Sequence, residues 1–128
     1  MNELSMGVNW TAVIVGFVLA FLLGWLWYSE KLFGPKWAAG VGVTISKDMP
    51  FPAAAMLTQA LSTFGLSWLF GITAAKEHLL TICLIVVTII LFIVSNGKFA
   101  QKSNSAITIE AGYIFAMAVI LFLAQAIL

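Results

Sequence analysis

The chain has 128 residues, of which 62% are hydrophobic and 9% are charged, and its formal net charge is +1. An ordinary soluble domain carries about 25% charged residues, and a domain of this size cannot hide so much apolar surface from water. The composition therefore excludes an ordinary soluble protein. The weak positive charge comes from lysines without any arginine, so we expect no nucleic-acid partner.

Four long apolar runs predict an all-helical integral membrane bundle of four transmembrane helices, folded as a single domain over residues 1–128. A membrane-spanning helix needs about 20 mainly apolar residues. The expected spans are approximately 8–28, 51–74, 79–97 and 106–128. These runs are too long for membrane strands and lack a period of two. The first run has no basic region before it, so we interpret it as a retained helix and not as a signal peptide.

The first span carries small residues at every fourth position, namely Ala12, Gly16, Ala20 and Gly24. Small side chains on one helix face let two backbones approach closely, which is how many membrane helices associate. The spacing alone does not say whether the partner helix belongs to the same chain or to a second copy.

Aromatic residues gather where the first span ends and the long connector 31–49 begins: Trp25, Trp27, Tyr28, Phe33 and Trp37. Tryptophan and tyrosine are enriched at membrane interfaces, and Gly34-Pro35 breaks a helix. We therefore predict an interfacial segment between helices 1 and 2, with the aromatic side chains as interfacial anchors. A binding site for a lipid headgroup or a substrate is the alternative.

This order of residues resembles a known family. The motif consists of Asn9-Trp10, Gly24, Trp27-Tyr28-Ser29, Leu32-Phe33-Gly34 and Trp37, with Gly112-Tyr113 in the last span. It is similar to the bacterial membrane family called domain of unknown function 1761. The resemblance implies the four-span layout and a bacterial origin. It implies no activity.

The second span is the most polar, with Thr58, Gln59, Ser62, Thr63 and Ser67 at helical spacings. We expect these side chains to form one polar stripe that faces the bundle interior or a protein interface, because an amide in lipid needs hydrogen-bond partners. Interhelical contacts are the simpler interpretation. The sharper one is that the stripe lines a polar path.

The third span is rich in isoleucine, valine and leucine, so we expect it to be the most lipid-exposed. In the fourth span, Gly112 and Ala116 repeat the small-residue spacing. Glu110 is the only acid clearly within a predicted span. It lies near the same end as Lys98, Lys102 and Lys31, which favours an interfacial salt bridge or a helix-dipole role over a catalytic or transport role.

The lysines also predict an orientation. With four spans, one side holds Lys76, and the other holds Lys31, Lys36, Lys47, Lys98 and Lys102. Because basic loops stay in the cytoplasm, we expect a multi-pass protein of the bacterial inner membrane with both termini outside.

No set of residues predicts chemistry. His78 is the sole histidine and Cys83 the sole cysteine, so we expect no metal, no cofactor and no enzymatic activity. Small four-span exporters carry a membrane-embedded glutamate in the first span, which this chain lacks. We predict a structural or accessory protein that is surrounded by membrane lipids and self-associates as a homo-oligomer. An unidentified membrane-protein partner stays open. The alternative is a small oligomeric transporter or channel with a polar path lined by helix 2 and with Glu110 as a charge on the cytoplasmic side.

Overall fold

The computed structural model describes residues 2–43 and 52–128, and every regular element in these two ranges is a helix. Four helices are long: α2 (Trp10–Trp27), α4 (Ala53–Ala75), α5 (Leu79–Phe99) and α6 (Asn104–Ile127). Two are short: α1 (Asn2–Ser5) and α3 (Gly34–Val41). Within the described ranges, the four long helices are the ones long and apolar enough to cross a membrane. The predicted fold class, an all-helical four-span bundle, is confirmed.

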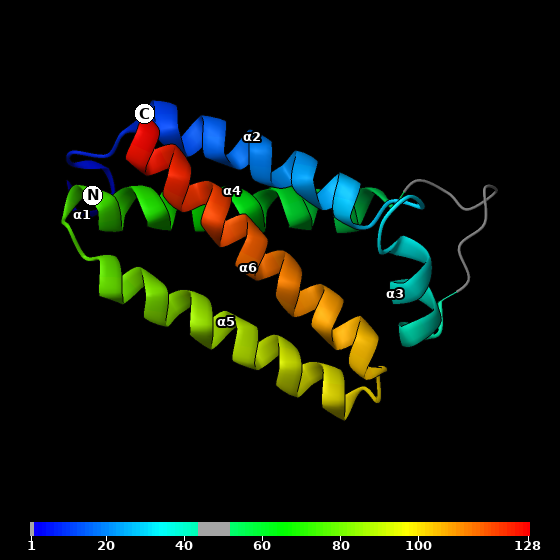
Figure 1. Ribbon diagram of the computed structural model, residues 1–128. Coiled ribbons are helices and arrows are strands. Elements are labelled where there is room, and N and C mark those ends of the chain that lie inside the picture. The colour runs from blue at the N-terminus through cyan, green and yellow to red at the C-terminus, as the bar shows by residue number, and fades with distance from the viewer. Residues whose placement is uncertain (1, 44–51) are drawn as a thin grey trace.

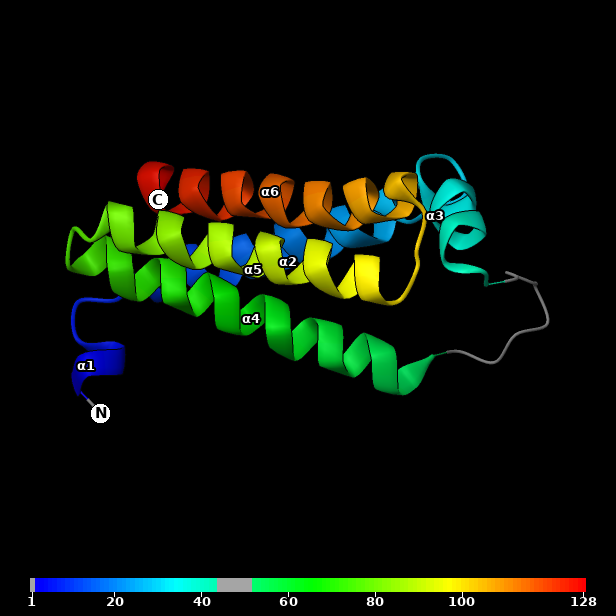
Figure 2. The same cartoon turned by 90° about the horizontal axis from the view of Figure 1, so that it is seen from below.

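The long helices alternate in direction and form a bundle with two distinct ends (Figures 1 and 2). At one end lie α1, the turn between α4 and α5, and the C-terminus. Here the Trp68 indole donates to the Leu4 carbonyl oxygen at 2.7 Å, and the Lys76 ammonium donates to that of Glu3 at 2.8 Å. The turn between α5 and α6 lies at the other end, beside α3. The α4–α5 turn therefore lies at the opposite end of the bundle from α3 and the α5–α6 turn, as four alternating spans require.

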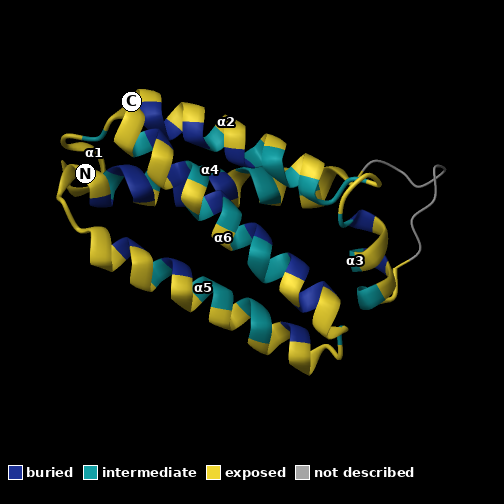
Figure 3. Cartoon of the chain, in the orientation of Figure 1, coloured by how far each residue is buried: buried dark blue, intermediate teal, exposed yellow. Residues whose placement is uncertain are grey.

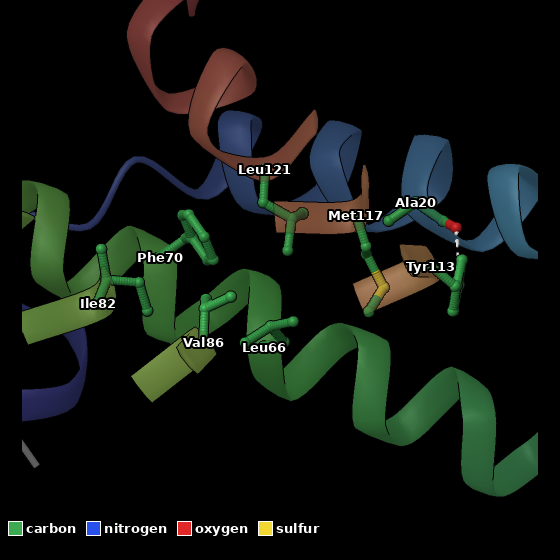
Figure 4. Close-up of a cluster of buried hydrophobic side chains, with 8 residues drawn as sticks. All are labelled: Ala20, Leu66, Phe70, Ile82, Val86, Tyr113, Met117 and Leu121. Carbon is green, nitrogen blue, oxygen red and sulfur yellow. Dashed lines mark hydrogen bonds between the residues drawn. The ribbon is translucent and has the colours of Figure 1, made fainter. Parts of the chain in front are cut away.

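Side chains from all four long helices build the core, and α6 contributes the most (Figure 4). The cluster comprises Ala20 from α2, Leu66 and Phe70 from α4, Ile82 and Val86 from α5, and Tyr113, Met117 and Leu121 from α6. Only 11% of the most apolar stretch of α5 is buried, against 39% for α6. Helix α5 is thus the most exposed span, as expected for the third apolar run (Figure 3).

The small-residue face of α2 packs inside the same chain. Ala12, Gly16 and Ala20 are buried. A Cβ atom added to Gly16 would lie 3.0 Å from Leu121 Cδ2 on α6 and 3.3 Å from Ser67 Oγ on α4. The absence of a side chain at Gly16 therefore allows α2 to approach both neighbours, which answers the question that the spacing alone left open at this position.

The connector after α2 contains a helix where the sequence indicated only an interfacial segment with helix breakers. Pro35 lies in the first turn of α3, where its fixed φ suits a helix and its missing N–H costs nothing. Gly42 ends α3 in the left-handed region with φ of 80°. The Ser103 N–H donates to the Gly40 carbonyl oxygen at 2.9 Å, which joins α3 to the start of α6. Gly34 and Gly42, which would interrupt a long helix, thus mark the beginning and the end of a short one. Residues 44–51, which include Lys47, lie outside the described residues.

Candidate functional site

Glu110 is the centre of a polar cluster at the α3 end of the bundle. Its Oε2 atom accepts a hydrogen bond from the Trp37 indole at 2.8 Å. The same oxygen lies 2.9 Å from Lys102 Nζ, forming a salt bridge in which the side chains of Lys102 and Glu110 are 29% and 16% exposed. The carboxylate therefore links α6 to α3 and to the turn before α6. Because the ion pair is partly buried, salt screens it less than it would screen a pair at an open surface.

A tight turn positions the lysine of this pair. Helix α5 ends at Phe99, and Gln101 adopts a left-handed conformation with φ of 60°. The Ser103 hydroxyl caps α6 by accepting from the Ala106 N–H at 3.0 Å. Lys102 thereby lies just before α6, and its side chain reaches along the helix to Glu110 over a separation of eight residues. The sequence offered Lys31, Lys98 and Lys102 as partners for Glu110, and in the structure Lys102 forms the salt bridge.

The aromatic residues predicted as interfacial anchors divide into two groups. Trp25 is 70% exposed and points away from the bundle, as an anchor does. Trp27 turns inward. Its indole donates to the Ile109 carbonyl oxygen at 3.0 Å, and its ring centroid lies 4.8 Å from the ring centroid of Phe33. Trp27 therefore joins α2 to α6, and Phe33 in the connector packs against the Trp27 ring.

Tyr28 occupies the space between the polar cluster and the core. It follows the last residue of α2, and its ring centroid lies 5.5 Å from Trp37 and 5.6 Å from Tyr113. Burial, and secondarily the negative charge of Glu110, raises the pKa of the Tyr28 phenol well above its usual value. Tyr28 thus packs against Trp37 of the polar cluster and Tyr113 of the core.

A second set of hydrogen bonds continues from Tyr113 into the bundle. The Tyr113 hydroxyl donates to the Ala20 carbonyl oxygen at 3.1 Å, as the dashed line in Figure 4 shows. It accepts from the Gln59 amide at 3.2 Å, and the same amide lies 3.4 Å from Thr63 Oγ1. One turn further along α4, the Ser67 hydroxyl donates to the Val13 carbonyl oxygen at 2.7 Å. These bonds join α4 to α2 and α6.

Within one chain, the polar residues of the second span do not all face the bundle interior, and a protein interface for the outward-facing ones stays a prediction. Thr63 and Ser67 are buried and Gln59 is half-buried, but Thr58 and Ser62 are exposed. Residues one position apart differ by about 100° around a helix, so the 58/62 pair faces outward when the 59/63 pair faces inward. The hydroxyls of Thr58 and Ser62 donate to backbone carbonyls four residues earlier, which satisfies them without another helix.

The remaining small residues, Gly24, Gly112 and Ala116, lie half-buried on α2 and α6. A Cβ atom at Gly24 would meet the Tyr113 hydroxyl oxygen at 2.5 Å, and one at Gly112 would lie 3.3 Å from the Trp27 ring. These glycines therefore leave room for the aromatic side chains of the site. Sequence reasoning missed Tyr113 as the partner of Gln59. The need of a membrane amide for a hydrogen-bond partner was the signal that could have pointed to it.

The chemistry available to this arrangement is limited to hydrogen bonding and one ion pair. Among the described residues, no group of three or more histidine, cysteine, aspartate or glutamate side chains could hold a metal ion. In the same ranges, every buried side-chain nitrogen and oxygen has a hydrogen-bond partner. Gln59, Ser67 and Tyr113 bond to a neighbouring helix, whereas the Thr73 hydroxyl donates to backbone carbonyls of its own helix.

These features define a small four-span membrane protein whose polar side chains join its helices. The chain belongs to the family described as protein of unknown function (DUF1761), whose model matches residues 11–125. The matched range runs from the start of α2 to the last turn of α6, so it takes in the interior hydrogen bonds and the Glu110 cluster. No curated protein and no solved structure matches the chain.

Proposed function

We propose that this protein is a structural or accessory membrane protein that self-associates and has no enzymatic activity of its own. The observation that supports the proposal is that polar side chains in the interior form hydrogen bonds between helices. Tyr113, Gln59 and Ser67 are all bonded to a neighbouring helix. A protein that holds its bundle together in this way has a rigid interior, which suits a scaffold or a subunit.

The outer face of α4 is the surface on which we propose that copies meet. Small residues recur there at helical spacing, with Ala54, Thr58 and Ser62 all exposed. Gly65 continues this face, and a Cβ atom added to it would have no atom within 4 Å. Small residues permit close backbone approach between membrane helices, and exposed hydroxyls can exchange their local hydrogen bonds for bonds to a second copy.

Self-association is tested by cross-linking and by a bulky substitution on this face. In a Cys83→Ser background, Ser62→Cys should give a disulfide-linked dimer on oxidation in membranes. Thr88→Cys on α5, a matched exposed position whose hydroxyl also bonds its own helix, should give far less. Adding Gly65→Leu should abolish the Ser62→Cys dimer, because the leucine separates the two helices. A monomeric mass in lipid nanodiscs, with equal cross-linking at both positions, would contradict the proposal.

We further propose that the protein resides in the bacterial inner membrane with both termini outside. The support is the lysine distribution: Lys31, Lys36, Lys98 and Lys102 lie at the α3 end, and Lys76 at the other.

Impermeant thiol reagents test this orientation in intact cells, again with Cys83 replaced by serine. A cysteine introduced by Asn2→Cys should be labelled. One introduced by Ser105→Cys, exposed at the start of α6, should be labelled only after the cells are broken. The reverse pattern would place the termini in the cytoplasm.

A specific observation also favours a second candidate, a small oligomeric transporter or channel. Polar groups succeed one another from Glu110 at the bundle end, past Tyr28 and Tyr113, to Gln59 and Thr63 inside. Such a succession is what a proton or ion path through a membrane protein requires. Flux measurements on Gln59 and Thr63 variants, described in the Discussion, separate this candidate from the first.

A further inference from the structure

A groove of about 530 Å³ lies between α5 and α6, on the side of α6 where α5 packs. Ligand sites in proteins commonly measure about 300–1,000 Å³. The two helices are antiparallel neighbours (Figures 1 and 2). The residues that line the groove run from Lys98 and Asn104, beside the α5–α6 turn, to Ile90 and Phe115. At its inner end the lining is apolar, with Ile90 on α5 and Phe115 on α6. Phe115 is exposed, so this end opens on the surface that faces the hydrocarbon of a membrane.

The other end of the groove is polar and positively charged. Lys98 lies in the last turn of α5, and Asn104 is the first residue of α6. Both are exposed, and among the described residues neither side chain makes a hydrogen bond or an ion pair. Lys102, the other lysine of this turn, is bound to Glu110. Lys98 is therefore the cation of this turn that is free to bind a ligand.

Charge and polarity thus change along one continuous groove. An unpaired ammonium and an amide lie at the end of the groove beside the α5–α6 turn, and the apolar part of the groove extends from them toward the middle of the two helices. The positive end of the α6 dipole lies beside Lys98 and adds to the attraction of an anion. A ligand that fits must carry a negative group at one end and a long apolar chain at the other.

We propose that this groove binds an anionic phospholipid. The phosphodiester lies at Lys98 and Asn104, and one acyl chain lies between α5 and α6 over Val94 and Ala111. Charge complementarity selects an anionic headgroup over a zwitterionic one, because the ammonium at the rim has no counter-ion within the described protein. The site lies apart from the Glu110 cluster and from the outer face of α4, so it does not depend on either proposed function.

Native mass spectrometry of the purified protein in mild detergent, titrated with single lipids, tests the proposal. Phosphatidylglycerol should bind about fivefold more tightly than phosphatidylcholine with the same acyl chains, the effect expected of one lysine near the surface. Lys98→Gln should remove this preference. Lys36→Gln, an exposed lysine at the same end of the bundle on α3, should leave it intact.

A groove-filling variant tests the acyl-chain part. Ala111→Phe should weaken the binding of both lipids, because its ring takes the space of the chain. Soluble sn-glycerol 3-phosphate should not displace bound phosphatidylglycerol, since it lacks the chain. Three results would each overturn the proposal: an unchanged lipid preference in Lys98→Gln, undiminished binding in Ala111→Phe, or displacement of the lipid by glycerol phosphate.

Discussion

Replacing Gly34 by alanine should lower the free energy of unfolding by about 3 kcal/mol, at the upper end of what overpacking a rigid site costs. A Cβ atom at Gly34 would collide with the Tyr28 carbonyl oxygen and lie 2.8 Å from that of Ser29. Both obstacles are backbone atoms of the turn that follows α2. The Gly34 N–H itself donates to the Ser29 carbonyl oxygen at 3.0 Å, so the turn cannot open without losing this bond.

The functional consequence should be the release of α3 from α6. Gly34 begins the helix that carries Trp37, whose indole binds Glu110. If the turn changes shape, this hydrogen bond is lost and the Lys102–Glu110 pair becomes more exposed. We expect Trp37 to become accessible to an aqueous fluorescence quencher in a variant whose other tryptophans are replaced by phenylalanine.

Unfolding by sodium dodecyl sulfate in mixed micelles measures the change in stability. Ala39→Leu is the matched control, since it adds a larger side chain to an exposed position of the same helix and should change stability little. Equal stability of Gly34→Ala and the natural protein would show that the turn is not fixed as described.

Replacing Tyr113 by phenylalanine should lower the free energy of unfolding by about 1–2 kcal/mol. Two hydrogen bonds of its hydroxyl would be lost, to Ala20 and from Gln59, and one such bond between membrane helices contributes about 0.6 kcal/mol on average. Leaving the half-buried Gln59 amide with a poorer set of partners adds to this cost. Gln59→Leu should cost less, because it removes the amide that needs partners.

A double-mutant cycle isolates the contact between these two residues. The double variant should be less destabilised than the sum of Tyr113→Phe and Gln59→Leu, since each single change already breaks the shared bond. Thr88→Val on α5 is the control, because the Thr88 hydroxyl bonds only its own helix. Strict additivity would contradict the hydrogen bond between Gln59 and Tyr113.

The same residues decide between the two proposed functions. The combined change Gln59→Leu and Thr63→Val should leave proton flux unaltered in proteoliposomes containing a pH-sensitive dye, if the interior groups serve only to join helices. A flux present in the natural protein and lost in a variant that still assembles would support the transporter or channel. Loss of assembly without any flux in the natural protein would support the structural role.

The sequence by itself determined the architecture. Four long apolar runs near the length of a membrane span leave helices as the available structure, because lipid offers no hydrogen-bond partners for an open backbone. Composition and spacing also indicated that α5 would be the most exposed span and that Glu110 lies near the lysines of one end. These features depend on each residue's own polarity and on its depth along a helix, which can be counted along the chain.

Only the tertiary structure decided how each helix is rotated and which residues meet. The rotation of α4 divides its polar stripe, turning Thr63 inward and Ser62 outward, and no spacing within one helix sets that angle. The pairs Gln59–Tyr113 and Trp37–Glu110 are separated by 54 and 73 residues, and they form because α6 packs against both α4 and α3. Hydroxyls that can bond their own backbone do not reveal from the sequence whether they face lipid or protein. The packing of neighbouring helices settles that choice, because it fixes which face of each helix is covered.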